Sequence, residues 1–218
     1  VEEMFAGVKQ KNPDVLVHCD CVQGFGKILF SLNRIKADMV TMSSHKIHGP
    51  KGCGAIYVRE GVNVRPLCFG GSQESKVRPG TENVPGIAAF GHASLKALRD
   101  IRENWEHVKE LNLYLTDCLR QMEDVVINSP SGAVPYVLNI SVLPFATEEL
   151  LHEMRMRGIY LSGSSACEKG ARSHVIRAMG IEGPRADSVV RIGLGKKNTR
   201  EEVTVLVETL NELIKRGK

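Results

Sequence analysis

A lysine flanked by hydroxyl and imidazole side chains follows an expected buried strand. The segment Ser43-Ser44-His45-Lys46 comes after an apolar run that ends at Met42, and it leads into Gly-Pro and Gly turns. Burial favours the neutral lysine amine, which forms a Schiff base with an aldehyde, while hydroxyl and imidazole groups can hold a phosphate. The segment therefore indicates a site for an aldehyde cofactor, with a surface turn carrying two solvated lysines as the alternative.

A carboxylate ends another apolar run upstream. This residue is Asp20, and Gln23 follows it shortly afterwards. In pyridoxal-phosphate enzymes a carboxylate keeps the pyridine nitrogen protonated, so that the ring can accept electrons from the substrate carbanion. We expect Asp20 to fill this role and Gln23 to hydrogen-bond the phenolic oxygen of the ring. With Ser43, His45 and Lys46, they predict a site for pyridoxal 5'-phosphate.

The two segments resemble the cofactor-binding core of the cysteine desulfurases, a branch of the class V aminotransferases. The resemblance continues in the family's order through four further segments: Gly70–Glu74, Arg78–Asn83, Ser162–Cys167 and Val190–Gly195. It implies that Thr81 reaches the cofactor phosphate of the partner subunit in a homodimer. It also implies that Cys167, on a Ser/Gly-rich loop, accepts sulfur, and that Arg191 binds the substrate carboxylate. A guanidinium suits a carboxylate, and a thiol on such a loop can be exposed and ionised.

The resemblance implies a cysteine desulfurase that converts L-cysteine to L-alanine and leaves a persulfide on Cys167. Lys46 would move the alpha proton, while His45 would either relay protons or order hydrogen bonds on the phosphate side. A sulfur-acceptor protein, either an iron-sulfur scaffold or a tRNA-thiolation enzyme, would take the sulfur. Two alternatives stay open, namely a noncatalytic remnant or partner-binding subunit of the same fold, and a selenocysteine lyase.

Family members are longer, so the chain is expected to be the carboxyl-terminal part of a type I pyridoxal-phosphate-dependent transferase fold. This α/β fold would comprise the end of the large-domain sheet in residues 1–95 and a small α+β domain with the cysteine loop in residues 96–218. Apolar runs predict buried strands in the first part, at residues 15–19, 39–43 and 53–58. The pattern of the second part predicts a long helix through residues 101–122, strands at 137–142, 159–161 and 189–194, a helix from Thr147, and a capping box at 199–202 before a final helix.

Composition restricts the remaining classes of function. The 29 basic and 25 acidic residues are spread along all 218 positions, which argues against direct nucleic-acid binding. The sequence contains no apolar stretch of membrane-spanning length and does not begin with a signal-type segment. We therefore expect a cytoplasmic protein without membrane association.

The six cysteines do not form a disulfide framework at their irregular spacing. A zinc site is an alternative for some of them, but no C-x-x-C pair supports it, and no metal is expected. Alternation along a strand predicts that Cys19 and Cys21 share one face while Asp20 points to the other. We expect Cys53, Cys68 and Cys118 to lie in or near the core.

Overall fold

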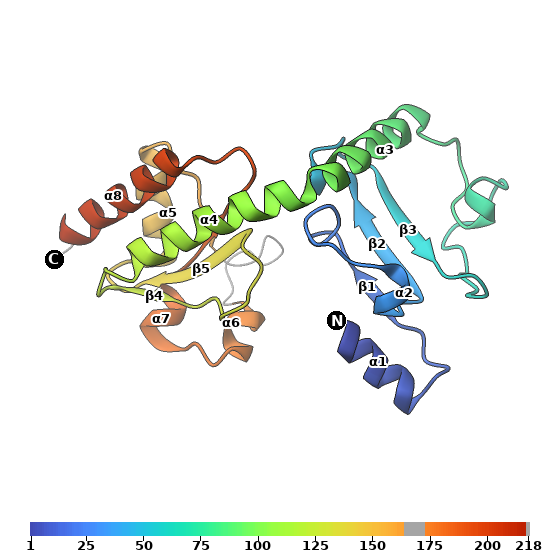
Figure 1. Ribbon diagram of the computed structural model, residues 1–218, viewed down its shortest axis with the longest axis horizontal. Coiled ribbons are helices and arrows are strands. Elements are labelled where there is room, and N and C mark those ends of the chain that lie inside the picture. Colours follow the sequence, from blue (N-terminus) through green and yellow to red (C-terminus); the bar gives the residue numbers. More distant parts are fainter. Residues whose placement is uncertain (164–172, 217–218) are drawn as a thin grey trace. The chain divides into compact units, whose positions relative to one another are not determined.

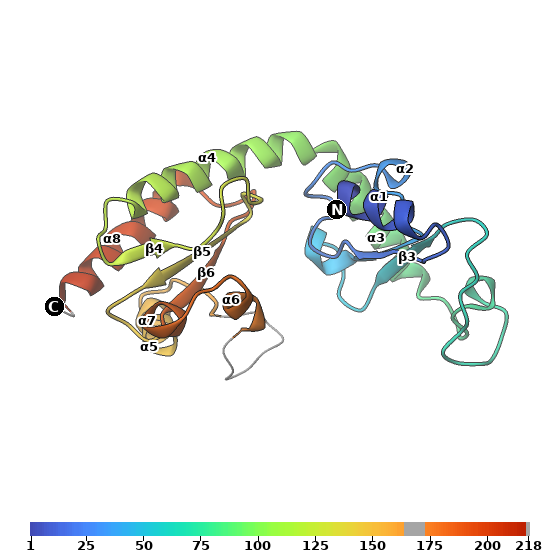
Figure 2. The ribbon, with the colours of Figure 1, turned by 90° about the horizontal axis from the view of Figure 1, so that it is seen from below.

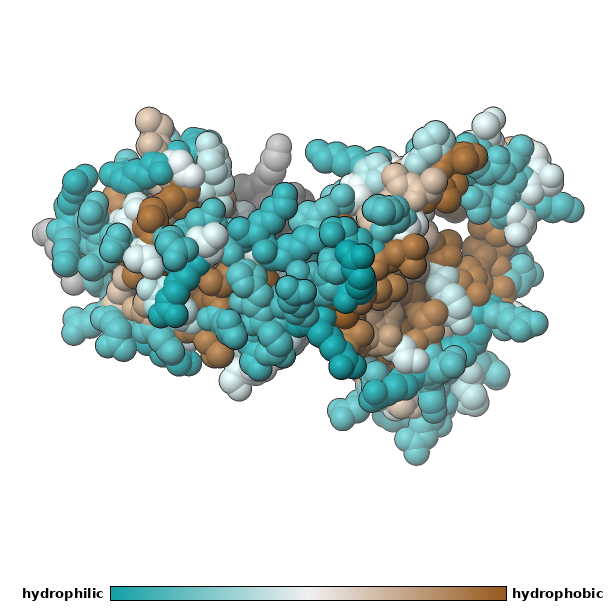
Figure 3. All heavy atoms as spheres, turned by 45° about the horizontal axis from the view of Figure 1, so that its top comes forward, coloured by the Kyte–Doolittle hydropathy of each residue, from teal (hydrophilic) through white to brown (hydrophobic). Residues whose placement is uncertain are grey.

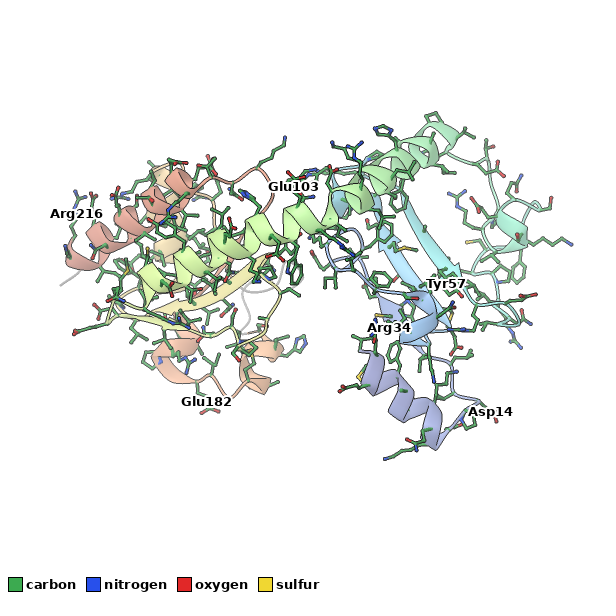
Figure 4. All side chains as sticks on the ribbon, in the orientation of Figure 1. Asp14, Arg34, Tyr57, Glu103, Glu182 and Arg216 are labelled. Atoms are coloured by element: carbon green, nitrogen blue, oxygen red, sulfur yellow. The ribbon has the colours of Figure 1, made fainter. Side chains whose placement is uncertain are left out.

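The computed structural model describes residues 1–163 and 173–216. The chain forms two compact units, Val1–Glu103 and Asn104–Lys218. Glu103, which ends the first unit, lies on the helix that continues into the second (Figures 1 and 4). The domain boundary that we expect near residue 95 stays a prediction. None of the helices in the described part of the chain is long and apolar enough to cross a membrane.

The first unit is built on a three-stranded sheet in the order β1-β2-β3. Strand β1 pairs parallel to the central strand β2, which pairs antiparallel to β3. The elements of this unit are α1 (Glu2–Lys11), β1 (His18–Asp20), α2 (Leu32–Ile35), β2 (Met39–Ser43), the 3-10 helix η1 (Ser44–Ile47), β3 (Gly54–Val58), the 3-10 helix η2 (Glu74–Lys76) and α3 (Val84–Arg99). The parallel pair matters for the site because both of its strands end at the same edge of the sheet.

Burial within the first unit is uneven. Val40 at the centre of β2 is fully buried, whereas Gly54, Ala55 and Ile56 of β3 are exposed. The expectation of a buried strand is therefore wrong for β3. Figure 3 shows apolar side chains at the surface of this unit, and the most exposed large ones are Leu67 and Phe69.

The second unit has an antiparallel sheet in the order β4-β5-β6, and it contains the largest core cluster. Its elements are α4 (Ile101–Leu119, which begins in the first unit), β4 (Val125–Ile127), β5 (Val137–Val142), α5 (Thr147–Met156), α6 (His174–Ala178), α7 (Gly183–Asp187), β6 (Val189–Gly193) and α8 (Arg200–Arg216). Helix α4 runs along one side of this sheet in Figure 2, and Tyr114 on α4 contacts Thr204 on α8 through their hydroxyls at 3.0 Å. The sheet and these helices bury apolar residues such as Leu115, Ile140 and Leu210.

Two local expectations have clear outcomes in this unit. The capping box is confirmed, because the Glu202 carboxylate accepts from the Thr199 N–H at 3.1 Å and the Thr199 hydroxyl accepts from the Glu202 N–H at 3.2 Å. The strand expected at residues 159–161 is wrong, since only an isolated bridge between Ser162 and Arg191 forms there. A short apolar run becomes a strand only where a neighbouring backbone can pair with it along its length.

Candidate functional site

Asp20 stands at the carboxyl end of β1, opposite Thr41 of β2 in the strand register. Its carboxylate accepts a hydrogen bond from the Val22 N–H at 2.9 Å, and its side chain is exposed. The Cys19 and Cys21 sulfurs are 3.5 Å apart, which confirms that these two residues share a face. Alternation then directs Asp20 to the other face of the strand.

The turn after β1 brings Gln23 and Lys27 together. The carbonyl of Cys21 accepts from the Gly24 N–H at 3.0 Å and from the Phe25 N–H at 2.7 Å, so the chain turns tightly at this point. The Lys27 ammonium then donates to Oε1 of Gln23 at 3.0 Å. Gln23 is therefore held beside a cation at the edge of the sheet where Asp20 lies.

This turn packs directly on the segment that carries Lys46. Gly26 has a φ of +70°, and a Cβ built there would lie 2.7 Å from the Ile47 side chain and 3.0 Å from Ala97. A side chain at position 26 would therefore force the turn away from η1. The close approach explains how two segments distant in sequence reach one edge of the sheet.

Lys46 lies in η1, which begins immediately after β2 ends at Ser43. The Ser43 hydroxyl and Nδ1 of His45 form a hydrogen bond of 2.7 Å, so these two polar groups act as a fixed pair. Lys46 is half-buried and His45 is exposed. An amine thus stands next to an imidazole-hydroxyl pair at the carboxyl end of the central strand.

A tight backbone turn maintains this arrangement. Ser44 is fully buried, and the backbone N–H of Gly49 donates to its carbonyl at 3.0 Å. A Cβ at position 49 would overlap the Ser44 hydroxyl oxygen. Position 49 therefore accepts only glycine without displacing η1.

The electrostatics of this edge favour an anion. Burial, together with the positive charge of Lys46, lowers the pKa of Lys27 from its ordinary value. Two ammonium groups thus lie near enough to repel each other. A bound phosphate or carboxylate would relieve this repulsion.

Thr81 lies in the loop between η2 and α3 and is exposed. The loop is braced by Gln73, whose Oε1 accepts from the Gly80 N–H at 3.1 Å, while Gly80 has a φ of +99°. The hydrogen bonds described for residues 1–163 do not connect Thr81 with Asp20 or Lys46. The role expected for Thr81 toward a partner subunit stays a prediction.

Arg191 lies on β6 in the second unit, where it pairs with Asn139 of β5. Its N–H donates to the Ser162 carbonyl at 2.6 Å, its carbonyl accepts from the Ser162 N–H at 3.2 Å, and Nη2 donates to the Ser162 hydroxyl at 3.2 Å. Ser162 therefore holds both the backbone and the guanidinium of Arg191. Cys167 lies outside the described residues.

Sequence reasoning missed two residues with direct contacts to predicted site residues. Lys27 contacts Gln23, which lies four residues before it in a Gly-rich turn. This spacing was the sequence feature that could have predicted the contact. Ser162 contacts Arg191. The Ser/Gly segment that contains Ser162 was recognised in the sequence, but no function was assigned to this residue. Both contacts depend on chain segments that meet only in the folded structure.

The cysteines differ in environment. Cys53 and Cys118 are partly buried, but Cys68 is exposed, so its expected place in or near the core is wrong. Burial, the hydrogen bond and charge of the neighbouring Cys19, and the charge of Asp20 raise the pKa of the Cys21 thiol to about 12. At neutral pH Cys21 is therefore a thiol, unlike the ionised thiol that a sulfur acceptor requires.

The chain belongs to the aminotransferase class-V family, whose model matches residues 1–206. Its similarity to cysteine desulfurases, expected from the motifs, is confirmed. It is 34% identical over 209 residues to cysteine desulfurase IscS of Methanosarcina thermophila, covering 94% of this chain and 52% of that protein. It is 37% identical over 206 residues to the mitochondrial cysteine desulfurase of Saccharomyces cerevisiae, covering 92% of this chain and 41% of the relative.

Solved structures bear out the α/β fold. A NifS-like protein matches with a TM-score of 0.90 and 37% identity, covering 98% of this chain and 56% of that chain. A NifS-like protein from Rickettsia africae matches with a TM-score of 0.88 and 31% identity, and the match covers 97% of this chain and 56% of that chain. The chain therefore spans about half the length of the relatives it matches.

Pyridoxal phosphate is the cofactor of this family, and the donor set of the first unit fits it. Asp20 offers a carboxylate for the pyridine nitrogen, and Gln23 offers an amide for the phenolic oxygen. The hydroxyl of Ser43 and the imidazole of His45 can bind phosphate oxygens, and the amine of Lys46 can bond to the aldehyde. The repulsion between Lys27 and Lys46 adds an independent reason for an anionic ligand at this edge.

Proposed function

We propose that this chain carries the cofactor lysine, the substrate arginine and the sulfur-accepting thiol of a cysteine desulfurase. The observation that carries the proposal is the juxtaposition at the carboxyl edge of β1 and β2. Asp20 ends one strand, and the Ser43-x-His45-Lys46 segment ends its parallel neighbour. The similarity to cysteine desulfurases along nearly the whole chain supports the proposal.

The residues divide the work between binding and proton transfer. Asp20 and Gln23 orient the cofactor, and Ser43 and His45 hold its phosphate. In the homodimer, Thr81 reaches the phosphate of the cofactor bound in the partner subunit. When bound, pyridoxal phosphate withdraws electrons from the substrate α carbon and weakens the carbon-sulfur bond beyond it.

Arg191 and Cys167 act on the substrate itself. The guanidinium of Arg191 binds the carboxylate of L-cysteine, with its position fixed by Ser162. Lys46 moves the α proton, and His45 serves either as a proton relay or as a ligand of the phosphate side. The thiolate of Cys167 attacks the substrate sulfur, which leaves alanine and a persulfide for an acceptor protein.

The cofactor assignment is tested by peptide mapping. The purified protein is incubated with pyridoxal phosphate, reduced with borohydride and digested, and the labelled lysine is identified by mass spectrometry. We expect the label on Lys46 and its loss in Lys46→Ala. The matched control is Lys51→Ala, because Lys51 is an exposed lysine of the same turn and its replacement should leave the label in place. A label on Lys51 that persists in Lys46→Ala would refute the assignment.

Sulfur transfer is tested separately. After incubation with L-cysteine, the Cys167 peptide should gain one sulfur, about 32 Da, and alanine should be released. Cys167→Ser should abolish sulfur transfer and keep the cofactor label. Normal alanine release in that variant, with the added sulfur on Cys68 or Cys21, contradicts the assigned role.

The same assays distinguish the alternatives. A noncatalytic remnant would take up no cofactor under any of these conditions. A selenocysteine lyase would turn over selenocysteine and leave cysteine unchanged. The acceptor protein is identified by which partner removes the sulfur from Cys167, with an iron-sulfur scaffold and a tRNA-thiolation enzyme as the two candidates.

A further inference from the structure

Two thiols face each other beside β1, outside the set of groups used above. Cys19 lies in the strand and Cys21 follows it, and their sulfurs are 3.5 Å apart. Both side chains are partly buried and pack at the edge of the core that contains Val17 and Val40. They are therefore on the other face of the strand from Asp20 and still partly reachable from solvent.

The backbone that carries the two sulfurs is held on both sides. Cys19 is in register with Val40, and the Cys21 N–H donates to the Thr41 carbonyl at 2.9 Å. The Cys21 carbonyl is fixed by the turn that follows. The sheet and the turn therefore fix the backbone positions of the two cysteines.

The spacing of the two sulfurs suits a shared cation better than a disulfide. Two sulfurs bound tetrahedrally to one zinc ion at about 2.3 Å lie about 3.8 Å from each other, close to the 3.5 Å observed here. A disulfide requires sulfurs about 2.05 Å apart and Cα atoms usually within about 6.8 Å. Residues i and i+2 of an extended strand are about 6.6 Å apart, at the upper end of that range, and the observed sulfur separation of 3.5 Å is well beyond the length of a disulfide bond.

We propose that Cys19 and Cys21 form a two-sulfur chelating site for a divalent thiophilic cation of the zinc and cadmium class. Binding replaces the two thiol protons by two metal-sulfur bonds and releases both protons to solvent, without a change of oxidation state. The described residues contain no cluster of three or more ligating side chains. The remaining positions on the cation are therefore taken by water or by a small thiol.

Cadmium chloride is the probe, because cadmium-thiolate bonds absorb in the ultraviolet. The reduced protein is titrated in the presence of a competing chelator, and Cys19→Ser and Cys21→Ser are compared with wild type. The matched control is Cys68→Ser, which removes an exposed thiol from the same unit. We expect one tight equivalent in wild type and in the control, and an affinity at least tenfold lower in each of the two variants.

A measurement on the wild-type protein covers the case in which a serine variant fails to fold. Bound cadmium should protect Cys19 and Cys21 from alkylation, while Cys68 continues to react, as read by mass spectrometry of the peptides. Equal alkylation of Cys19 and Cys21 with and without cadmium would overturn the proposal. So would tight binding that survives in both serine variants, or a Cys19–Cys21 disulfide forming in air while the reduced protein takes up no cadmium.

Discussion

At the scale of single residues, the amines of Lys27 and Lys46 create a region of positive charge at the end of the parallel strand pair. Lys27 belongs to the turn after β1, and Lys46 belongs to the helix after β2. Burial and the neighbouring charge both disfavour the ammonium form of Lys27. The positive charge of this region therefore favours the binding of an anionic ligand.

This electrostatic arrangement predicts how Lys27 titrates. Because its pKa is lowered, the reactive neutral amine should appear at lower pH than the ordinary value of 10.5 allows. Acetylation of the Lys27 peptide, followed by mass spectrometry across a pH series, measures this directly. In Lys46→Met the midpoint pH of Lys27 acetylation should rise part of the way back to 10.5. Burial, which is the larger cause of the lowered pKa, remains in that variant. Lys36→Met, which removes an exposed lysine, should leave it unchanged. A Lys27 midpoint at 10.5 in the unaltered protein would contradict this picture.

A second residue-scale prediction concerns Ser162 and rests on the proposed function. Removing its hydroxyl frees the Arg191 guanidinium from one hydrogen bond of 3.2 Å. Since a hydrogen bond of this kind contributes on the order of 1 kcal/mol, Ser162→Ala should raise KM for L-cysteine several-fold with a smaller change in kcat. The control is Ser131→Ala, an exposed serine of the same unit. An unchanged KM would mean that Ser162 does not position Arg191.

At the scale of elements, one carboxylate fastens three parts of the first unit. Asp38 accepts from the Val17 N–H at 2.8 Å, pairs with Lys9 of α1 at 2.7 Å and lies 3.7 Å from Nε of Arg59. Burial by itself raises the pKa of Asp38, but the hydrogen bonds from Lys9 and Val17 and the charges of Lys9 and Arg59 give a net lowering. Asp38 thus connects α1, the start of β1 and the end of β3.

Replacing Asp38 by Asn should weaken this connection. The free energy of unfolding measured with urea at neutral pH should fall by about 1–3 kcal/mol, as expected when a buried group loses charged partners. A lowered carboxyl pKa stabilises the fold above the ordinary value of 3.8, and this contribution disappears as the pH falls through the lowered value. The difference between wild type and Asp38→Asn should therefore narrow below pH 3.8. Asp14→Asn, an exposed acid, serves as the control, and an effect as large there would refute the argument.

The elements also show what could be predicted from sequence. Strands β2 and β5 match the expected bounds at 39–43 and 137–142 because apolar residues make up most of both segments. Only His18 and Cys19 of the run at 15–19 fall within β1, since the pairing of β1 with β2 covers His18 to Asp20. Likewise the motifs led to Lys46 and Asp20, whereas Lys27 and Ser162 could be found only from contacts between separate segments. Local sequence patterns identify candidate site residues, whereas the contacts of those residues depend on the tertiary structure.

At the scale of the whole molecule, each unit encloses its own apolar clusters. The largest cluster joins α4, β5, β6 and α8 in the second unit, and two smaller ones lie in the first unit, one around Val40 of β2 and one between Ile47 of η1 and Phe90 of α3. Cores of this kind often open as separate cooperative regions. A substitution in one unit should therefore lower the free energy of local unfolding in that unit and leave it unchanged in the other.

Hydrogen exchange can test this independence. Asp38→Asn should reduce protection in peptides from β2 and leave β5 unchanged. Thr199→Ala removes the N-terminal cap of α8, with an expected cost of about 1 kcal/mol, and should reduce protection in β5 and leave β2 unchanged. Thr199→Ser keeps the capping hydroxyl and should behave like wild type. If both substitutions lower protection equally in both units, the two cores do not open separately.

The partners of Asp38 also have a consequence for synthesis on the ribosome. They stand at positions 9, 17 and 59, on both sides of Asp38 in the sequence. While the nascent chain grows, Lys9 and Val17 are already present when Asp38 emerges, but Arg59 and the whole of β3 are still to come. One edge of the central strand therefore stays unpaired until β3 has left the ribosome, and a slow stretch of translation at that stage would give the sheet time to close before α3 emerges.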